Sequence, residues 1–203
     1  MSKTITQLFD NYSDASNAVT ELERLGVPHG DISLVASNAD RAHGDHDSVR
    51  DDVGKGATTG ALLGGAGGLL AGLGMLAIPG LGPVVAAGWL VSTAVGAGVG
   101  AAAGGAAGGL VGALKNAGVD EDDAHVYSEG VRRGGSLVSA KVADKLVREA
   151  KAAMEEHRPI DVAARGQSYR ESGWTSFDEN APPYTPEEVE RERGRYGAIN
   201  APR

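Results

Sequence analysis

Two histidines and two aspartates stand close together near position 45, in the order His43, Asp45, His46 and Asp47. Imidazole and carboxylate groups bind divalent metal ions, but two imidazoles three residues apart in a polar loop impose no particular coordination geometry. We therefore expect a solvated loop here and no metal centre. The other histidines have no ligand spacing and are expected at the surface: His29, His125 and His157.

Paired glycines suggest a nucleotide site at two places, and neither has the neighbours that such a site needs. Gly54-Lys55 is followed by Gly56 instead of Ser or Thr, and Val49 stands where a phosphate-binding loop needs its first glycine. Gly98-Val99-Gly100 lies inside a glycine repeat with no preceding strand. No nucleophile elbow and no cysteine is present for covalent catalysis. The sequence therefore predicts a protein that is not an enzyme and binds no cofactor.

Composition limits the possible partners of the chain. Its 203 residues have a net charge of −8, which argues against non-specific binding to nucleic acid, because that requires clustered basic side chains. The first residues lack a charged stretch followed by an apolar run, so we expect no secretion signal. Charge and glycine content divide the chain into four parts: 1–55, 56–114, 115–165 and 166–203.

The first part has the pattern strand, helix, strand, followed by a polar loop. Residues 4–9 and 31–36 are β-rich, and Ser13 is placed to cap a helix between them that ends at Gly26. That helix has one apolar face. The face consists of Ala15, Ala18, Val19, Leu22 and Leu25.

The third part repeats this order after an additional helix over 120–132. A strand is predicted at 136–142, a helix at 144–157 and a last strand at 160–164, directly after Pro159. Two strand–helix–strand units predict an α+β fold, specifically a ferredoxin-like βαβ…βαβ sandwich. Arg132 and Arg133 close the additional helix, where cations favour the carbonyl end of the helix dipole; contact with lipid headgroups is the alternative.

The second part, 56–114, interrupts this sandwich and contains no Asp, Glu, Lys, Arg or His. Small residues recur in it every fourth position, which places them on one helix face and lets a second helix approach closely. We therefore predict a glycine-zipper helical hairpin whose turn contains Pro79, Gly80, Gly82 and Pro83. The predicted helix-packing positions are Gly60, Gly64, Gly68, Gly72, Gly88, Ser92, Gly96, Gly100, Gly104, Gly108 and Gly112.

Two environments suit such a hairpin. In a bilayer the backbone must stay helical and small residues permit tight packing, and residues 57–78 would span about 33 Å against a hydrocarbon core of about 30 Å. We therefore expect the protein in the cytoplasmic membrane, and Arg50, Lys55 and Lys115 beside the hairpin favour a globular part facing the cytoplasm. A cytoplasmic location is the alternative. The alternative is a soluble oligomeric scaffold or ligand-sensing module with the hairpin buried in the assembly. The expected partners are thus the lipid bilayer or further copies of the chain.

Several of these stretches together resemble the bacterial general stress protein family with a 17M-like domain, which includes low-temperature-induced proteins. The similarity covers residues 3–165 and is most specific at 77–83 and at Arg132-Arg133-Gly134-Gly135. The resemblance implies a stress-induced, non-secreted bacterial protein with a glycine-zipper region and no established reaction. The other stretches that resemble the family are 11–15, 31–35, 108–114 and 127–131.

The fourth part, 166–203, lies outside this resemblance and is predicted to be mostly disordered. Thr185-Pro186-Glu187-Glu188 combines a capping residue, a proline at the first helical position and a glutamate three residues after the cap, so a short helix is expected over 186–196. Trp174, Phe177 and Tyr184 are expected to be exposed, in a segment that either docks on a partner protein or only adds solubility.

Overall fold

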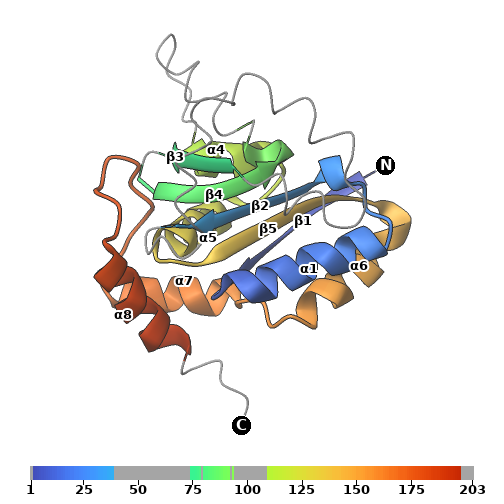
Figure 1. Ribbon diagram of the computed structural model, residues 1–203. Coiled ribbons are helices and arrows are strands. Elements are labelled where there is room, and N and C mark those ends of the chain that lie inside the picture. Colours follow the sequence, from blue (N-terminus) through green and yellow to red (C-terminus); the bar gives the residue numbers. More distant parts are fainter. Residues whose placement is uncertain (1, 39–73, 79, 92, 94–108, 198–203) are drawn as a thin grey trace.

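The computed structural model describes residues 2–38, 74–78, 80–91, 93 and 109–197 (Figure 1). The described chain is an α+β protein with strands in both halves of the sequence. Its elements in order are β1 (Ser2–Phe9), α1 (Tyr12–Arg24), η1 (His29–Asp31), β2 (Ile32–Ser37), β3 (Gly74–Ile78), β4 (Gly82–Gly88), α4 (Gly109–Asn116), α5 (Glu121–Arg132), β5 (Ser136–Ala143), η4 (Asp144–Leu146), α6 (Val147–Glu155), α7 (Val162–Glu171) and α8 (Pro186–Gly197).

The strands form one antiparallel sheet in the order β1-β5-β2-β4-β3. Helix α1 connects β1 to β2, and β5, from the third part of the sequence, lies between those two strands. The strands predicted at 4–9, 31–36 and 136–142 are thus confirmed as β1, β2 and β5, within two residues at each end.

Helices cover both faces of the sheet. Side chains along a strand alternate between the two faces, so one strand contributes to a core on each of them. On β1, Phe9 joins a core with α1 and α6, while Leu8 joins a second core with α4 and α5. Figure 1 shows α1 and α6 side by side on the first of these faces. The helices predicted around these two cores are confirmed as α1, α5 and α6.

The start of α1 differs from the prediction by two residues. Asn11, not Ser13, is the N-cap, and its Oδ1 accepts hydrogen bonds from the Asp14 backbone N–H at 2.8 Å and from the Ser13 hydroxyl at 2.7 Å. Both residues have side chains suited to capping. The apolar face is as expected, with Leu22 fully buried and Leu25 packed at its edge.

The predicted helical hairpin is wrong over residues 74–88, which form a β-hairpin, whereas residues 109–114 are helical as part of α4. β3 pairs with β4 from Gly74↔Ala86 to Ile78↔Gly82, and β4 pairs with β2. The chain does reverse direction at Gly80 and Leu81, but between two strands. The cause is tertiary: β2 offers an unpaired edge, and β-branched Val84 and Val85 suit a strand better than a helix.

The small-residue positions are distributed accordingly. Gly88 is the last residue of β4, not part of a helix face, and a Cβ there would collide with the Ile32 carbonyl of the neighbouring strand. Gly112 lies within α4. The zipper prediction for the others concerns residues outside the described ranges, as does Pro79: Gly60, Gly64, Gly68, Gly72, Ser92, Gly96, Gly100, Gly104 and Gly108. Among the described helices, none has the length and apolar character needed to cross a bilayer.

The strand predicted at 160–164 is also wrong, so the second strand–helix–strand unit lacks its last strand. Asp161 caps α7 instead, its Oδ1 accepting from the Ala164 backbone N–H at 3.0 Å. One strand-like contact remains before the helix, a 2.7 Å hydrogen bond from the Ile160 N–H to the Leu8 carbonyl at the edge of β1. The capping side chain and the helix-forming residues after it outweigh the alternating pattern.

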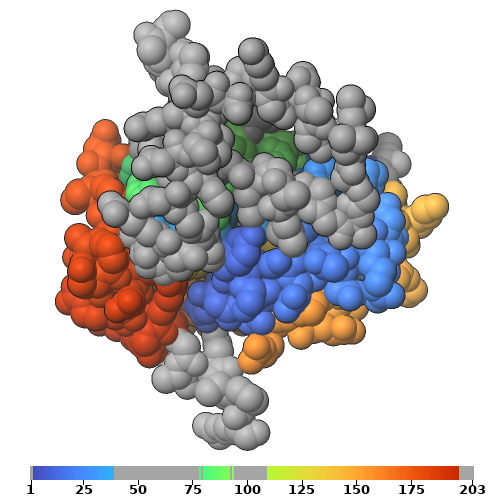
Figure 2. All heavy atoms as spheres, in the orientation of Figure 1, coloured from blue at the N-terminus to red at the C-terminus, as the bar shows by residue number. Residues whose placement is uncertain are grey.

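The region after residue 165 is structured through Gly197, contrary to the prediction of a mostly disordered tail. The predicted helix is confirmed as α8, and its capping box forms: the Thr185 N–H donates to Glu188 and the Glu188 N–H to the Thr185 hydroxyl. Phe177 is only 6% exposed and belongs to the core beneath α4 and α5. Figure 2 shows this C-terminal region, in red, beside the blue N-terminal region on the face in view.

Candidate functional site

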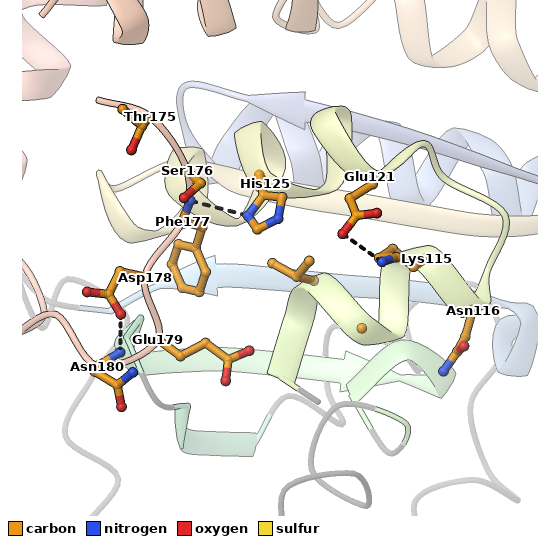
Figure 3. Close-up of a pocket in the computed structure, with 12 residues that line it drawn as sticks. Lys115, Asn116, Glu121, His125, Thr175, Ser176, Phe177, Asp178, Glu179 and Asn180 are labelled. Carbon is orange, nitrogen blue, oxygen red and sulfur yellow. Dashed lines mark hydrogen bonds and ion pairs between the residues drawn. The ribbon is translucent and has the colours of Figure 1, made fainter. Parts of the chain in front are cut away.

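The candidate site is an open pocket between α4, α5 and the segment 175–180, with a cavity volume of about 860 Å³ (Figure 3). Its volume falls within the range of small-molecule sites. Two parts of the chain that are distant in sequence contribute to it, the consecutive helices α4 and α5 and the segment 175–180. The lining consists of Val111, Gly112, Lys115 and Asn116 from α4, Glu121 and His125 from α5, and residues 175–180.

The turn between α4 and α5 fixes the charged side of the pocket. Lys115 Nζ lies 2.7 Å from Glu121 Oε1, and this contact lowers the pKa of the Glu121 carboxyl. Asp120 caps α5 by accepting a hydrogen bond from the Asp122 N–H at 3.0 Å. Both members of the ion pair are well exposed, at 43% and 62%, so they remain accessible to a ligand.

The opposite side of the pocket is held by Phe177. Its ring lies in the core, and its backbone N–H donates to His125 Nδ1 at 3.2 Å. A nitrogen that accepts this bond has no proton, so the neutral His125 ring has its proton on Nε2. The chain then passes the turn between β3 and β4, where Asp178 and Glu179 backbone atoms would contact a Cβ at Gly80. The segment 175–180 is thus bound to α5 at Phe177 and lies close to the turn between β3 and β4 at Asp178 and Glu179.

These groups allow recognition of a small polar molecule. Lys115 supplies a cation, Glu121 and His125 supply hydrogen-bonding groups, and Val111 and Phe177 are the large apolar residues of the lining. Sequence reasoning placed His125 at the surface without a role, and the structure assigns it the hydrogen bond to Phe177. Nothing in the sequence indicated this contact, because the two residues are 52 positions apart.

Metal binding finds no support in the described residues. They contain no group of three or more histidine and acidic side chains placed to hold a metal ion. The loop with His43 and His46 lies outside the described residues.

A second charged group is buried where α5 meets α8, and we call it the Arg133 cluster: Glu129, Arg133, Tyr169 and Glu192. Arg133 Nε lies 2.6 Å from Glu129 Oε1, and its Nη1 lies 2.8 Å from Glu192 Oε2 on α8. Its guanidinium group lies 4.2 Å from the Tyr169 ring centre. Burial lowers the pKa of Arg133, but the two carboxylates outweigh it and the net shift is upward.

The Arg133 cluster has a structural role, because its charged groups form ion pairs with one another. Arg133 is 9% exposed and Glu129 is fully buried, so neither can reach a lipid headgroup. Sequence reasoning treated Arg133 as a helix-end cation and missed its partners. The four-residue spacing of Glu129 and Arg133 is a signal for their ion pair, whereas the contact with Glu192 required the fold.

A further ion pair ties α7 to the loop before α1. Arg165 donates to both carboxylate oxygens of Asp10, at 2.9 and 3.2 Å, and its guanidinium lies 4.1 Å from the Tyr196 ring centre. Trp174 packs edge-on against Tyr169 with ring centres 5.7 Å apart. The aromatic residues predicted to be exposed in a docking segment thus bind this chain's own body.

No family model, no curated protein and no solved structure matches this chain. The fold and the pocket together therefore define the molecule only by class. It is an α+β protein whose antiparallel sheet is covered on both faces, with an open polar pocket beside α4 and α5.

Proposed function

We propose that this protein is a non-enzymatic bacterial stress-response protein that acts in the cytoplasm as a self-associating scaffold. In this proposal β1, β2 and β5 correspond to the ferredoxin-like part of the body. The charge-free, small-residue segment supplies the surface through which copies associate. The resemblance to the general stress protein family supports the biological setting.

One observation supports the scaffold over a membrane hairpin. In the middle of the charge-free segment, β4 pairs with β2 and β3 pairs with β4, so this stretch is part of the sheet. Leu81 and Val84 from this stretch are nearly or fully buried in the core of the body. Backbone and side chains that are satisfied inside the protein gain nothing from entering lipid. The remaining small residues adjoin this stretch in the sequence, and small residues favour close packing between copies.

The proposal is tested by measuring the mass of the full-length protein in detergent-free buffer by light scattering. Discrete oligomers are expected. Leu at Gly68 or Gly100 should dissociate them, because these positions belong to the four-residue repeat. Leu at Gly67 or Gly98 is the matched control, since on a helix it adds the same side chain about 100° away from Gly68 or about 160° away from Gly100. A monomeric wild-type protein contradicts the proposal.

Membrane association is the second candidate, favoured by the 59-residue stretch without charged side chains, 56–114. It is tested by flotation with vesicles of phosphatidylethanolamine and phosphatidylglycerol. Protein that floats with the vesicles and sediments from lysate without detergent supports this candidate. Protein that stays at the bottom of the gradient and in the high-speed supernatant excludes it.

A further inference from the structure

A groove runs along the outer edge of β1, and we call it the β1 groove. Its volume is about 580 Å³. The floor is the strand itself, from Thr4 to Gln7, and the walls come from opposite faces of the sheet. One wall contains Val119, Asp120, Asp123 and Tyr127, the other contains Lys151, Met154 and Glu155, and residues 159–162 close one end.

The edge of β1 presents backbone groups that point into this groove. β1 is the outermost strand on its side of the sheet. In an antiparallel strand the N–H and C=O of one residue point to the same side, and the side alternates along the strand. The Leu8 carbonyl accepts from Ile160 across the outer edge, so the backbone groups of Thr6 and Thr4 point outward as well.

Those outward groups are only partly used in the described chain. The Thr6 carbonyl accepts a hydrogen bond from the Tyr127 hydroxyl at 3.2 Å. Within the described residues, the N–H groups of Thr4 and Thr6 have no strand beyond them, because the chain turns into α7 after Ile160. An unpaired strand edge of this kind is a template for another extended segment.

The charges of the groove select the kind of segment. Asp120, Asp123, Glu155 and Asp161 line it, against the single cation Lys151. The pKa of the Asp123 carboxyl is raised by its burial and by the neighbouring Asp120 and Asp122. A cation placed in the groove would relieve this repulsion.

The same features disfavour a second copy of this chain as the occupant. Pairing two β1 edges would bring each copy's acidic walls against the same walls of the other, and like charges in contact oppose association. The two walls also flank the strand, so the groove suits a single extended segment better than the edge of another sheet.

We propose that the β1 groove binds an extended, lysine- or arginine-containing peptide segment of a partner protein, which adds as a sixth strand beside β1. The backbone of the segment pairs with Thr4 and Thr6 over about five residues, the usual length of a strand. Its basic side chains lie against the acidic walls, and its apolar ones lie beside the small exposed parts of Ile5 and Ile160. This site is separate from the small-residue segment and does not depend on self-association.

The test uses the full-length protein and a fluorescent peptide of alternating lysine and valine, with binding followed by anisotropy. Saturable binding is expected, together with slower amide hydrogen exchange at Thr4 and Thr6. A peptide of alternating glutamate and valine should not bind. A lysine–valine peptide N-methylated at alternate residues, on the edge that would pair, should lose binding, since it keeps the charge but not the hydrogen bonds. Equal binding of the methylated peptide, or none of the unmodified one, overturns the proposal.

Two double variants distinguish binding in the β1 groove from attraction to the overall negative charge of the protein. Asp123→Asn with Glu155→Gln removes two groove charges and should weaken binding about tenfold. Asp122→Asn with Glu156→Gln removes the same charge from the adjacent positions, which do not line the groove, and should change affinity less than about twofold. Equal weakening by both double variants would mean attraction to overall charge and would overturn the site.

Discussion

The Arg133 cluster and the Lys115–Glu121 pair place the same kind of ion pair in opposite surroundings. Arg133 is 9% exposed and is held by two carboxylates, one of them fully buried, whereas the Lys115 and Glu121 side chains are 43% and 62% exposed. Breaking a buried pair strands an uncompensated charge in the protein interior, while an exposed pair is screened by water on both sides. The first arrangement therefore holds elements together, and the second leaves its charges available to a ligand.

The largest effect is expected from Arg133→Ala. It leaves Glu129 fully buried without its main cation and removes the link to Glu192 on α8. We expect a loss of about 3–5 kcal/mol in the free energy of unfolding. Urea denaturation measures it, and Arg148→Ala serves as the control because the Arg148 side chain is 92% exposed. A loss below about 1 kcal/mol would show that the cluster does not hold the C-terminal region.

A second variant attacks the same contact through the backbone. Gly134 has φ +103°, and a Cβ there would collide with Val189 of α8. Gly118 has φ +89° with open space around it, so Gly118→Ala is the control that introduces backbone strain without a steric clash. We expect Gly134→Ala to cost about 2–3 kcal/mol and Gly118→Ala about 1 kcal/mol. Limited proteolysis between residues 172 and 185 should accelerate only in Gly134→Ala; equal rates would contradict docking of α8 at Gly134.

The sequence predicted the parts whose local signals agree with their surroundings. For α1, a capping residue, a continuous apolar face and Gly26 all point to one helix, and the capping box at Thr185 specified α8 in the same way. For β1, β2 and β5, β-rich residues between turn signals were sufficient. Agreement between several local preferences is what makes a segment predictable.

Residues 74–88 and 160–164 were mispredicted because remote contacts or a single side chain decided them. The four-residue spacing of small residues predicted helices, but it contains no information on the edge of β2, whose backbone forms the hydrogen bonds with β4. The alternation of apolar and polar residues predicted a strand at 160–164, but the Asp161 side chain caps a helix there instead. The pocket was not foreseen at all, because its two sides, α4–α5 and 175–180, meet only in the fold.

The third prediction concerns alkaline pH and Tyr169 of the Arg133 cluster. Burial raises the pKa of Tyr169, and the nearby Arg165 and Arg133 only partly oppose this. The folded protein therefore keeps a proton that the unfolded chain loses near pH 10, so this contribution is complete below pH 10 and declines above it. We expect Tyr169→Phe to remove about 1.4 kcal/mol of the fall in unfolding free energy between pH 9 and 11. Urea denaturation across this range measures the slope, and an unchanged slope would contradict the prediction.

The smallest effect is expected at the exposed pair, with Lys115→Gln. Glu121 is open to solvent, so losing its partner should lower the melting temperature by no more than about 1–2 °C. Because the contact lowers the pKa of Glu121, its contribution exists above the ordinary glutamate pKa and disappears as the pH falls through the lowered value. Thermal melts at pH 7 and pH 3, in low and high salt, measure this, and the difference from wild type should be smaller at pH 3 and in high salt. A loss of stability as large as that of Arg133→Ala would mean that the Lys115–Glu121 ion pair holds α4 to α5. The charged groups of the pocket would then have a structural role and would not be available to a ligand.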